Sequence, residues 1–413
     1  MRKRRVVATG LGTVSPFGLG IEAYWNALLR GESAVRPIER FDAGAYRSRL
    51  GAEVPRSIYD DEALRKACGG PAEDSAFFMA LAADEALRDA RVGPTFTDAD
   101  RAGCVLGTLC ASAREMMMIG RAYLETGPAP SAELIDSARP GYQLQFVADR
   151  YNLTGPTSLV STACASSTDA LGYAFDLIQL GECDRALAGG GDVLVESIHG
   201  GFNSMFALTT EAPRPFDRDR DGFCIGEGAG AVYLESLDSA RARGAGIYAE
   251  ILGYGLSNTA HHLTATSEDG AGEALAIRRA LDAAEISPDS IDYINTHGTA
   301  TRYNDATEIR AVQAVFGSRS SAILANSNKS AIGHCMGAAG ALEALSTILV
   351  LKNGAVPPTP FTRGNADGMN MDMVRGVARR RDIRHALSQS FGFGGACSCI
   401  VLGRWNGLDA KHD

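Results

Sequence analysis

Short apolar runs alternate with longer helical patterns along most of the chain. Nine runs of three to six residues, rich in small and aliphatic side chains, are expected to be strands: 6–11, 103–107, 158–161, 185–189, 231–235, 249–254, 293–295, 322–325 and 398–402. Apolar residues at helical spacing lie between many of these runs, which predicts an α/β fold. We expect two smaller sheets rather than one open sheet of nine strands.

The order of these patterns suggests an internal repeat. Residues 157–164 are typical of a strand that breaks into small residues before a helix, here expected over 167–180. Residues 322–329 do the same before a helix expected over about 336–352, and a glycine-rich turn beside an apolar strand follows each helix, at 188–191 and 391–395. The pattern predicts two related halves joined near residues 241–246, and we place the domains at 1–246 and 247–413.

Composition and charge exclude several classes of protein. Lys and Arg number 40 against 49 Asp and Glu, so the net charge is −9, which argues against a general nucleic-acid binder. The most apolar stretch, Leu342–Leu351, is shorter than the roughly 18 residues of a membrane-spanning helix and contains Glu343. The first residues lack an apolar signal-peptide core, and the nine cysteines form no paired CxxC motifs, so we expect a cytoplasmic protein with reduced thiols.

Cys164 is the first candidate for chemistry. It ends an apolar strand, lies among small residues and precedes a helix. A helix N-terminus stabilises a thiolate through its free N–H groups, so this position favours a nucleophile. A buried packing cysteine is the competing interpretation, and we prefer it for the other eight cysteines.

Two histidines lie where other predicted strands and helices meet. His297 follows the apolar run 293–295, and His334 precedes the small-residue helix start 337–340. Together with Cys164 they favour a Cys-His-His site over isolated structural histidines. A metal-dependent hydrolase is the rival interpretation, but the chain has no HExxH motif and no paired CxxC, so we expect no metal. The glycine-rich segments do not match GxxxxGK[ST] or GxGxxG either.

Motifs spread over nearly the whole chain resemble, in family order, those of the β-ketoacyl-[acyl-carrier-protein] synthases, in the elongating branch of the thiolase superfamily. They are Arg4-Arg5-Val6-Val7-Ala8-Thr9-Gly10-Leu11-Gly12, Ser161-Thr162-Ala163-Cys164-Ala165-Ser166-Ser167, Pro215-Phe216-Asp217-Arg218-Asp219-Arg220-Asp221-Gly222-Phe223, Gly226-Glu227-Gly228-Ala229-Gly230, His297-Gly298-Thr299-Ala300-Thr301, Asn304-Asp305-Ala306-Thr307-Glu308, Lys329-Ser330, Gly333-His334, Gly337-Ala338-Ala339-Gly340-Ala341 and Phe391-Gly392-Phe393-Gly394-Gly395. The resemblance implies a thiolase fold, in which duplicated halves form five layers, α-β-α-β-α, usually as a dimer.

The resemblance also implies roles for individual residues. Cys164 would accept an acyl group from a carrier-protein thioester, with the backbone N–H groups of Cys164 and Phe393 as the oxyanion hole. His297 and His334, both neutral, would stabilise the enolate that forms when malonyl carrier protein loses CO₂. Lys329 and Glu308 match buried charged residues that hold the histidines in place, and no cofactor is implied. Phe393 also matches a gating phenylalanine.

Further residues match the family's acyl pocket and carrier-binding surface. Cys110 and Phe202 are candidates for the pocket wall, and Arg65 with Lys66 matches part of a basic patch for an acidic carrier protein. Elsewhere in that patch, where the family often has basic residues, this chain has Pro128-Ala129-Pro130 and Met205-Phe206. A specialised carrier partner would account for this difference. Two other departures from the pattern are Asn328 and Ala396-Cys397.

The resemblance leaves the pathway open between fatty-acid synthesis and a dedicated type II polyketide or polyene pathway, with a slight preference for the latter. The chain would act as a homodimer or as a heterodimer with a related chain-length-factor subunit. The alternative from another class is a non-condensing scaffold that kept the fold. The intact set of Cys164, His297, His334 and Lys329 argues against it.

Overall fold

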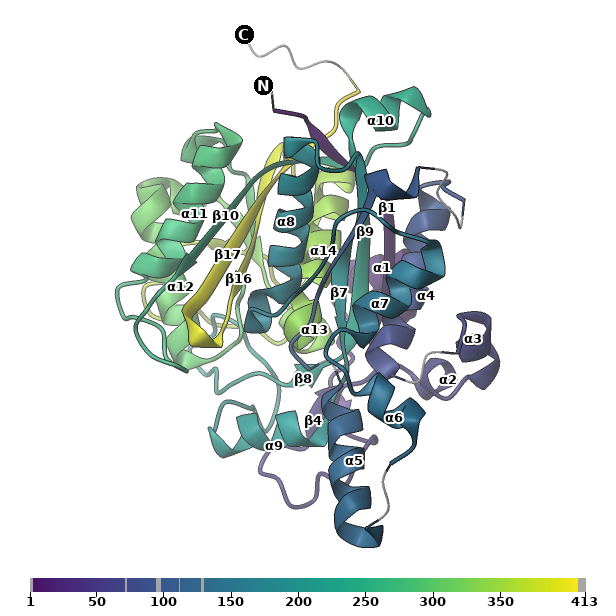
Figure 1. Cartoon of the computed structure of the whole chain (residues 1–413). Coiled ribbons are helices and arrows are strands. Elements are labelled where there is room, and N and C mark those ends of the chain that lie inside the picture. Colours follow the sequence, from purple (N-terminus) through teal and green to yellow (C-terminus); the bar gives the residue numbers. More distant parts are fainter. Residues whose placement is uncertain (1–2, 71–72, 94–97, 111, 128–129, 408–413) are drawn as a thin grey trace.

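The computed structural model describes residues 3–70, 73–93, 98–110, 112–127 and 130–407, and within them one hydrogen-bonded sheet of twelve strands dominates (Figure 1). Its strands are β1 (Val6–Ser15), β2 (Gly18–Leu19), β5 (Ala102–Gly107), β6 (Thr157–Val160), β7 (Arg185–Asp192), β9 (Gly228–Ser236), β10 (Ala249–Asn258), β11 (Tyr293–Asn295), β12 (Leu324–Asn326), β14 (Asp372–Met373), β16 (His385–Phe391) and β17 (Ala396–Arg404). The order is β14-β12-β11-β16-β17-β10-β1-β9-β7-β5-β6, with β2 on β1. Short strands outside it are β3 (Arg36–Pro37), β4 (Leu50–Ala52), β8 (Ile225–Gly226), β13 (Ala355–Val356) and β15 (Arg379–Arg380).

The helices follow the predicted alternation with strands. They are α1 (Ile21–Arg30), α2 (Arg56–Tyr59), α3 (Glu62–Ala67), α4 (Asp74–Asp89), α5 (Ala113–Thr126), α6 (Ala132–Ser137), α7 (Tyr142–Tyr151), α8 (Ser166–Leu180), α9 (Glu196–Ser204), α10 (Leu237–Ala242), α11 (Ala271–Ala284), α12 (Arg302–Phe316), α13 (Lys329–Ile332) and α14 (Ala339–Asn353). Short 3₁₀ segments include η2 (Ala163–Ala165), η5 (Met336–Ala338) and η6 (Phe393–Gly395). No helix in the described ranges is long and apolar enough to span a bilayer.

All nine predicted strands are present, but the expectation of two separate sheets is wrong. Antiparallel pairing of Val6 with Ile251, Val7 with Glu250 and Ala8 with Ala249 joins β1 to β10. This short ladder makes the strands of the two halves one continuous sheet. The apolar pattern of a strand predicts that the strand is buried, but it does not predict which strand pairs with it. The pairing of β1 with β10 therefore cannot be predicted from the sequence.

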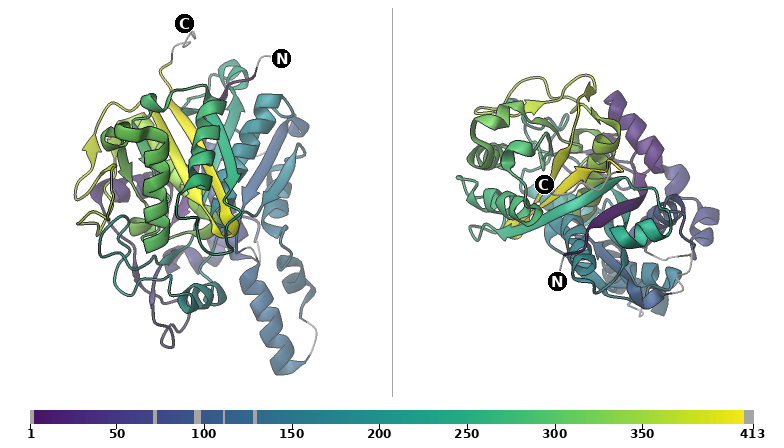
Figure 2. Two further views of the ribbon diagram at one scale, coloured as in Figure 1. Left: turned by 90° about the vertical axis from the view of Figure 1, so that its left-hand side faces the viewer. Right: turned by 90° about the horizontal axis from the view of Figure 1, so that it is seen from above.

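The elements form five layers with a helix pair in the middle, which confirms the predicted α-β-α-β-α arrangement. Helices α8 and α14 pack against each other in the middle, with the strands of the N-terminal half on one side and those of the C-terminal half on the other (Figures 1 and 2). Helices α4 and α7 cover the outer face of the first half, and α11 and α12 cover that of the second. Every residue from Ala339 to Leu351 is therefore buried.

The two central helices begin in equivalent ways, as the internal repeat predicts. Strand β6 leads through η2 into α8, and β12 leads through α13 and η5 into α14. The helices approach closely because Gly340 faces Thr168: a Cβ at Gly340 would lie 2.0 Å from the Thr168 hydroxyl. The N-terminal ends of both helices therefore meet at one place in the interior, and the two chain termini lie at the opposite end of the molecule (Figure 1).

Candidate functional site

Cys164 lies at the sharp turn between β6 and α8, as predicted. The residue before it, Ala163, has φ 54°, a left-handed conformation that is costly for a residue with a Cβ. The Ser166 hydroxyl fixes the turn, because it accepts a hydrogen bond from the Thr162 N–H (2.9 Å) and donates one to the Ala163 carbonyl (2.6 Å). The Cys164 side chain is thereby held at the start of the central helix and is buried.

The Cys164 thiol does not have the lowered pKa that a helix start alone predicts. Burial raises its pKa to about 11, while the positive charge of Lys329 and a hydrogen bond from the Phe393 N–H act in the opposite direction. The cost of desolvating a thiolate in this interior exceeds these two stabilising contributions. The resting side chain is a thiol, and Lys329 and the Phe393 N–H are placed to stabilise the thiolate as it forms.

His297 and His334 come together beside this turn. Their ring centroids are 5.4 Å apart at an interplanar angle of 83°. His297 follows β11, and His334 is fixed between β8 and η5 because its backbone N–H donates to the Cys224 carbonyl (2.8 Å) and its carbonyl accepts from the Gly226 N–H (2.9 Å). The two histidines are 37 residues apart in the sequence. The parallel pairing of β11 with β12 brings the segments that carry them together.

Both imidazoles are neutral at physiological pH. Burial lowers the pKa of each ring well below the ordinary value of 6.5, and the nearby charge of Lys329 lowers both further. Within the described residues, three of the ring nitrogens have no hydrogen-bond partner. They are Nδ1 and Nε2 of His334 and Nδ1 of His297. Buried nitrogens of this kind are free to engage a bound molecule.

Glu308 holds the backbone of His297. One of its oxygens accepts a hydrogen bond from the His297 N–H and the other accepts one from the Gly298 N–H, both at 2.8 Å. Glu308 lies on α12, so this contact ties the loop after β11 to the helix that follows it. The structure thus places Glu308 where it positions a histidine through its main chain.

Lys329 forms its ion pair with Glu343 and not with Glu308. The Lys329 ammonium contacts the Glu343 carboxylate, and both side chains are almost fully buried, at 1% and 2% exposure. Glu343 is the acidic residue inside the apolar stretch 342–351, and from the sequence it argues only against a membrane span. A single carboxylate in the most apolar helix of the chain is the signal that would have identified it.

Breaking this pair is expected to destabilise the fold strongly. Lys329→Met leaves the Glu343 carboxylate without a counter-charge in the interior, which typically costs about 3–5 kcal/mol. Urea unfolding followed by circular dichroism should show this loss, and the double variant Lys329→Met with Glu343→Gln should recover most of it. As a matched control, Arg30→Met removes the exposed ion pair with Glu32 and should leave the unfolding midpoint unchanged. Equal losses in the single and double variants would contradict this account.

Phe393 lies over the cysteine turn from the other half of the chain. It begins η6, the turn between β16 and β17, and its N–H group faces the Cys164 sulfur. Gly394 and Gly395 have φ values of 80° and 83°, a region that favours glycine, and the Phe393 ring is 38% exposed. This position suits an oxyanion donor next to Cys164 and an aromatic residue that reaches the protein surface.

Cys110 and Phe202 belong to one apolar cluster below the site. Cys110 is buried in it, and Phe202 packs against it from α9; the other buried members are Leu194, Leu208, Phe223, Ile225 and Met336. Burial raises the pKa of the Cys110 thiol well above its usual value, and the nearby Asp192 and Cys164 raise it further. The ring of Phe202 packs on Phe223 and Phe393 at centroid distances of 5.2 and 5.5 Å. Phe223 in turn packs on His334 (5.3 Å), so this cluster is continuous with the site.

Asp192 is a buried carboxylate that sequence reasoning missed. It accepts hydrogen bonds from the N–H groups of Leu109 (2.9 Å), Cys110 (2.9 Å) and Gly337 (2.6 Å), and from the Thr108 hydroxyl (2.5 Å). Burial raises its pKa to about 6. It ties the end of β5 to η5, and hence the wall below Cys164 to the segment after His334. In the sequence, the feature that points to Asp192 is its position directly after the glycine-rich run 189–191 of β7.

The predicted basic patch is only partly available for a partner. Lys66 is exposed on α3, but the Arg65 guanidinium forms an ion pair with Asp74 (2.6 Å) and lies over the Phe77 ring at 4.3 Å. Arg65 is therefore committed to internal contacts. Pro128 and Ala129 lie outside the described residues.

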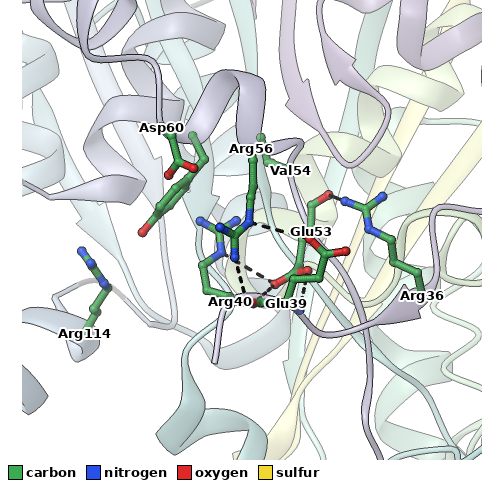
Figure 3. Close-up of a pocket in the computed structure, with 9 residues that line it drawn as sticks. Arg36, Glu39, Arg40, Glu53, Val54, Arg56, Asp60 and Arg114 are labelled. Carbon is green, nitrogen blue, oxygen red and sulfur yellow. Dashed lines mark hydrogen bonds and ion pairs between the residues drawn. The ribbon is translucent and has the colours of Figure 1, made fainter. Parts of the chain in front are cut away.

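A separate cavity of about 230 Å³ near α2 contains no predicted catalytic residue. It is lined by Arg36, Glu39, Arg40, Glu53, Val54, Arg56, Tyr59, Asp60 and Arg114 (Figure 3). Its guanidinium groups are already paired: Arg40 contacts Glu53 and Glu227 and lies over Tyr59 (3.4 Å), and Arg114 contacts Asp74 (2.8 Å). This balance of charges is typical of a structural network.

The assembled site can perform covalent acyl chemistry. A buried thiol at a strand-to-helix turn, with a neighbouring N–H donor, can form a thioester and stabilise the tetrahedral intermediate. Two neutral imidazoles beside it can donate hydrogen bonds to a developing oxyanion. The apolar cluster that contains Cys110 and Phe202 offers a wall for an apolar chain.

Comparisons with known proteins agree with this chemistry. The chain matches the models "Beta-ketoacyl synthase, N-terminal domain" over residues 3–240 and "Beta-ketoacyl synthase, C-terminal domain" over residues 248–362. It is 38% identical to the 3-oxoacyl-[acyl-carrier-protein] synthase 2 of Rhizobium meliloti (strain 1021), over 98% of this chain and 100% of that protein. The same enzyme of Coxiella burnetii (strain RSA 493 / Nine Mile phase I) is 36% identical, over 98% of this chain and 99% of that protein.

Two solved structures are also similar over nearly the whole chain. One is a type II polyketide synthase acyl-carrier protein in complex with its ketosynthase bound to the hexaketide, with a TM-score of 0.90 and 33% identity, covering 98% of this chain and 100% of the other. The second is the ishigamide ketosynthase/chain length factor, with a TM-score of 0.86, 36% identity and the same coverage.

Proposed function

The chain belongs to the β-ketoacyl synthase family, and we propose that Cys164, His297 and His334 carry out its reaction in the roles that follow. The enzyme is an acyltransferase that condenses an acyl group with malonyl-acyl carrier protein to give 3-oxoacyl-acyl carrier protein. The observation that supports the roles is the pair of neutral imidazoles beside a buried thiol at a helix start.

The first half-reaction transfers the acyl group to the enzyme. The Cys164 sulfur attacks the thioester carbonyl of the acyl carrier protein and loses its proton, and the carrier thiol leaves. The backbone N–H groups of Cys164 and Phe393 stabilise the oxyanion of the tetrahedral intermediate. The positive charge of Lys329 supports the thiolate while it forms, since it acts against the high pKa that burial imposes on Cys164.

The second half-reaction forms the carbon–carbon bond. Malonyl carrier protein loses CO₂, and the electron pair of the broken bond passes to the thioester oxygen as an enolate. His297 and His334 donate hydrogen bonds to this oxygen, which neutral imidazoles can do without a prior proton transfer. The enolate carbon then attacks the acyl-Cys164 thioester, and the Cys164 thiolate leaves with the two-carbon-longer product released on the carrier.

The comparisons support the partners, and departures from the family pattern support a proposal for the pathway. The enzyme acts with acyl carrier protein, as a homodimer or as a heterodimer with a chain-length-factor relative. We assign it to a dedicated type II polyketide or polyene pathway rather than to housekeeping fatty-acid synthesis. The departures Met205-Phe206 and Cys110 support this assignment.

We also propose that the enzyme works in the cytoplasm, since its nine cysteines are all free and buried. We further propose that its two functional halves divide at residue 246.

The test of this function is intact-protein mass spectrometry with a panel of acyl carrier proteins, followed by malonyl carrier protein. We expect an acyl adduct on the wild-type enzyme that turns into a 3-oxoacyl product two carbons longer. The preferred acyl group distinguishes the fatty-acid from the polyketide or polyene assignment. An enzyme that forms no adduct with any donor, even with a partner subunit present, would be a non-condensing scaffold.

A further inference from the structure

Four exposed apolar side chains lie on segments near the cysteine turn. Met205 and Phe206 follow α9, Leu263 lies in the loop after β10, and Phe393 lies in η6. Their exposed fractions are 44%, 74%, 79% and 38%. We call these four residues the apolar collar. Exposed apolar groups gathered at one place are typical of an interaction surface.

Contacts within the structure connect the collar segments to Phe393, whose backbone N–H faces the Cys164 sulfur. Phe202, one turn before Phe206, packs directly on the Phe393 ring at 5.5 Å. The chain then turns so that the Phe206 N–H donates to the Asn203 carbonyl (3.1 Å). From the other side, the Gly394 N–H donates to the Leu263 carbonyl (2.8 Å). Helix α9 and the tip between β16 and β17 lie at the end of the molecule away from both termini (Figure 1).

Among the described residues, Arg47 at the collar and Arg65 of the predicted basic patch are both engaged in contacts within the fold. Arg47 lies over the Phe206 ring at 5.5 Å and donates to the Leu208 carbonyl. Arg65 is held by Asp74 (2.6 Å), which leaves Lys66 as the exposed cation of the predicted patch. The whole chain carries a net charge of −9, so a strongly acidic partner meets a protein of the same net sign.

We propose that the apolar collar is the docking surface for the carrier protein. It selects a carrier whose surface is apolar rather than acidic around the point where the arm that bears the acyl thioester is attached. The inference rests on the proposed function, because the thioester must pass Phe393 to reach Cys164. The carrier surface next to the arm is therefore brought against the collar. Phe206 and Leu263 bury their exposed area against apolar side chains of the carrier, which stabilises the complex by removing apolar surface from water.

Docking of this kind has a distinct dependence on salt. Attraction between exposed charges weakens as the Debye length falls from about 10 Å at 0.1 M salt to about 3 Å at 1 M. Contact between apolar surfaces does not weaken in this way, and sodium chloride leaves it nearly constant. The salt dependence of carrier use therefore separates an apolar docking surface from a basic one.

The experiment measures acylation of Cys164 by three donors carrying the same acyl group: a strongly acidic carrier protein, a carrier with an uncharged docking helix, and acyl-pantetheine without a protein. For the wild-type enzyme we expect kcat/KM to favour the uncharged carrier about tenfold over the acidic one, and to change less than about twofold between 50 and 500 mM NaCl. Phe206→Ala should lower the ratio of carrier to acyl-pantetheine rates about tenfold, through KM.

Two further variants make the result specific. Phe206→Arg should reverse the preference toward the acidic carrier at 50 mM NaCl and introduce a steep salt dependence. Leu180→Ala, at an equally exposed leucine at the end of α8, should leave all three donors unchanged. A steep salt dependence of the wild-type enzyme, or a Phe206→Ala variant with an unchanged ratio, would overturn the proposal. Failure of all three donors to acylate wild-type Cys164 would instead overturn the proposed function.

Discussion

Replacing Cys164 by alanine is expected to eliminate the acyl-enzyme and to lower the rate of condensation at least about 10⁴-fold. The sulfur is the only atom of that side chain able to form the thioester, and removal of a nucleophile from a covalent mechanism typically costs several orders of magnitude. The fold should persist, because the change removes one sulfur atom from a side chain that lies at a fixed turn. Intact-protein mass spectrometry after incubation with acyl carrier protein measures the adduct directly.

Cys183→Ala is the matched control for this experiment. Cys183 is also fully buried and has a pKa raised to about 11 by burial, but it lies in the central apolar core, away from the histidines. Its variant should form the adduct with the wild-type mass shift. An adduct on the Cys164→Ala protein would place the nucleophile at another of the nine cysteines and would disprove the assignment.

The sequence predicted Cys164, His297 and His334 as the reacting side chains because their local settings are unusual. Cys164 and His334 lie among small residues at helix starts, and His297 directly follows a short apolar strand. Such junctions are where α/β folds expose functional groups, so position along the chain was informative. The internal repeat predicted that the two helix starts correspond, and the close contact of Gly340 with Thr168 shows that they meet.

The supporting carboxylates could not be assigned by the same reasoning. The partner of Lys329 is Glu343, 14 residues away on a helix that is apolar on all sides, and only packing decides between it and Glu308. Asp192 receives hydrogen bonds from segments near residues 108 and 337, which no local pattern connects. The direction of the Cys164 pKa shift also depends on burial, which a helix start alone does not reveal.

Strand β16 was missed for a related reason. Three consecutive polar residues, Ser388, Gln389 and Ser390, are fully buried in it. The Ser390 hydroxyl is satisfied by a hydrogen bond with Thr168 (2.7 Å) on the central helix α8. A buried strand with polar side chains has no alternation of apolar and polar residues, so no sequence pattern predicts it. The contacts that stabilise it form only in the folded chain.

Replacing either histidine is expected to separate the two half-reactions. His297→Ala and His334→Ala should each still form the acyl-enzyme at a rate within about tenfold of wild type, while loss of CO₂ from malonyl carrier protein falls about 10²–10⁴-fold. In the proposed mechanism the imidazoles stabilise the enolate oxygen, whereas the Phe393 N–H stabilises the acyl-transfer intermediate. Release of ¹⁴CO₂ and the mass of the acyl adduct measure the two steps independently. His385→Ala, at the distant start of β16, serves as the control.

The pH profile of decarboxylation distinguishes the protonation state of the donors. Burial and the charge of Lys329 lower the pKa of both His297 and His334 well below 6.5. A lowered pKa keeps the ring neutral as the pH falls through 6.5, so the rate should stay flat between pH 6 and 8 and decline only at lower pH. If the imidazolium were the donor, the rate would rise as the pH falls through 6.5. That rise would contradict the neutral-donor mechanism, and with it the function assigned to Lys329 in holding these rings uncharged.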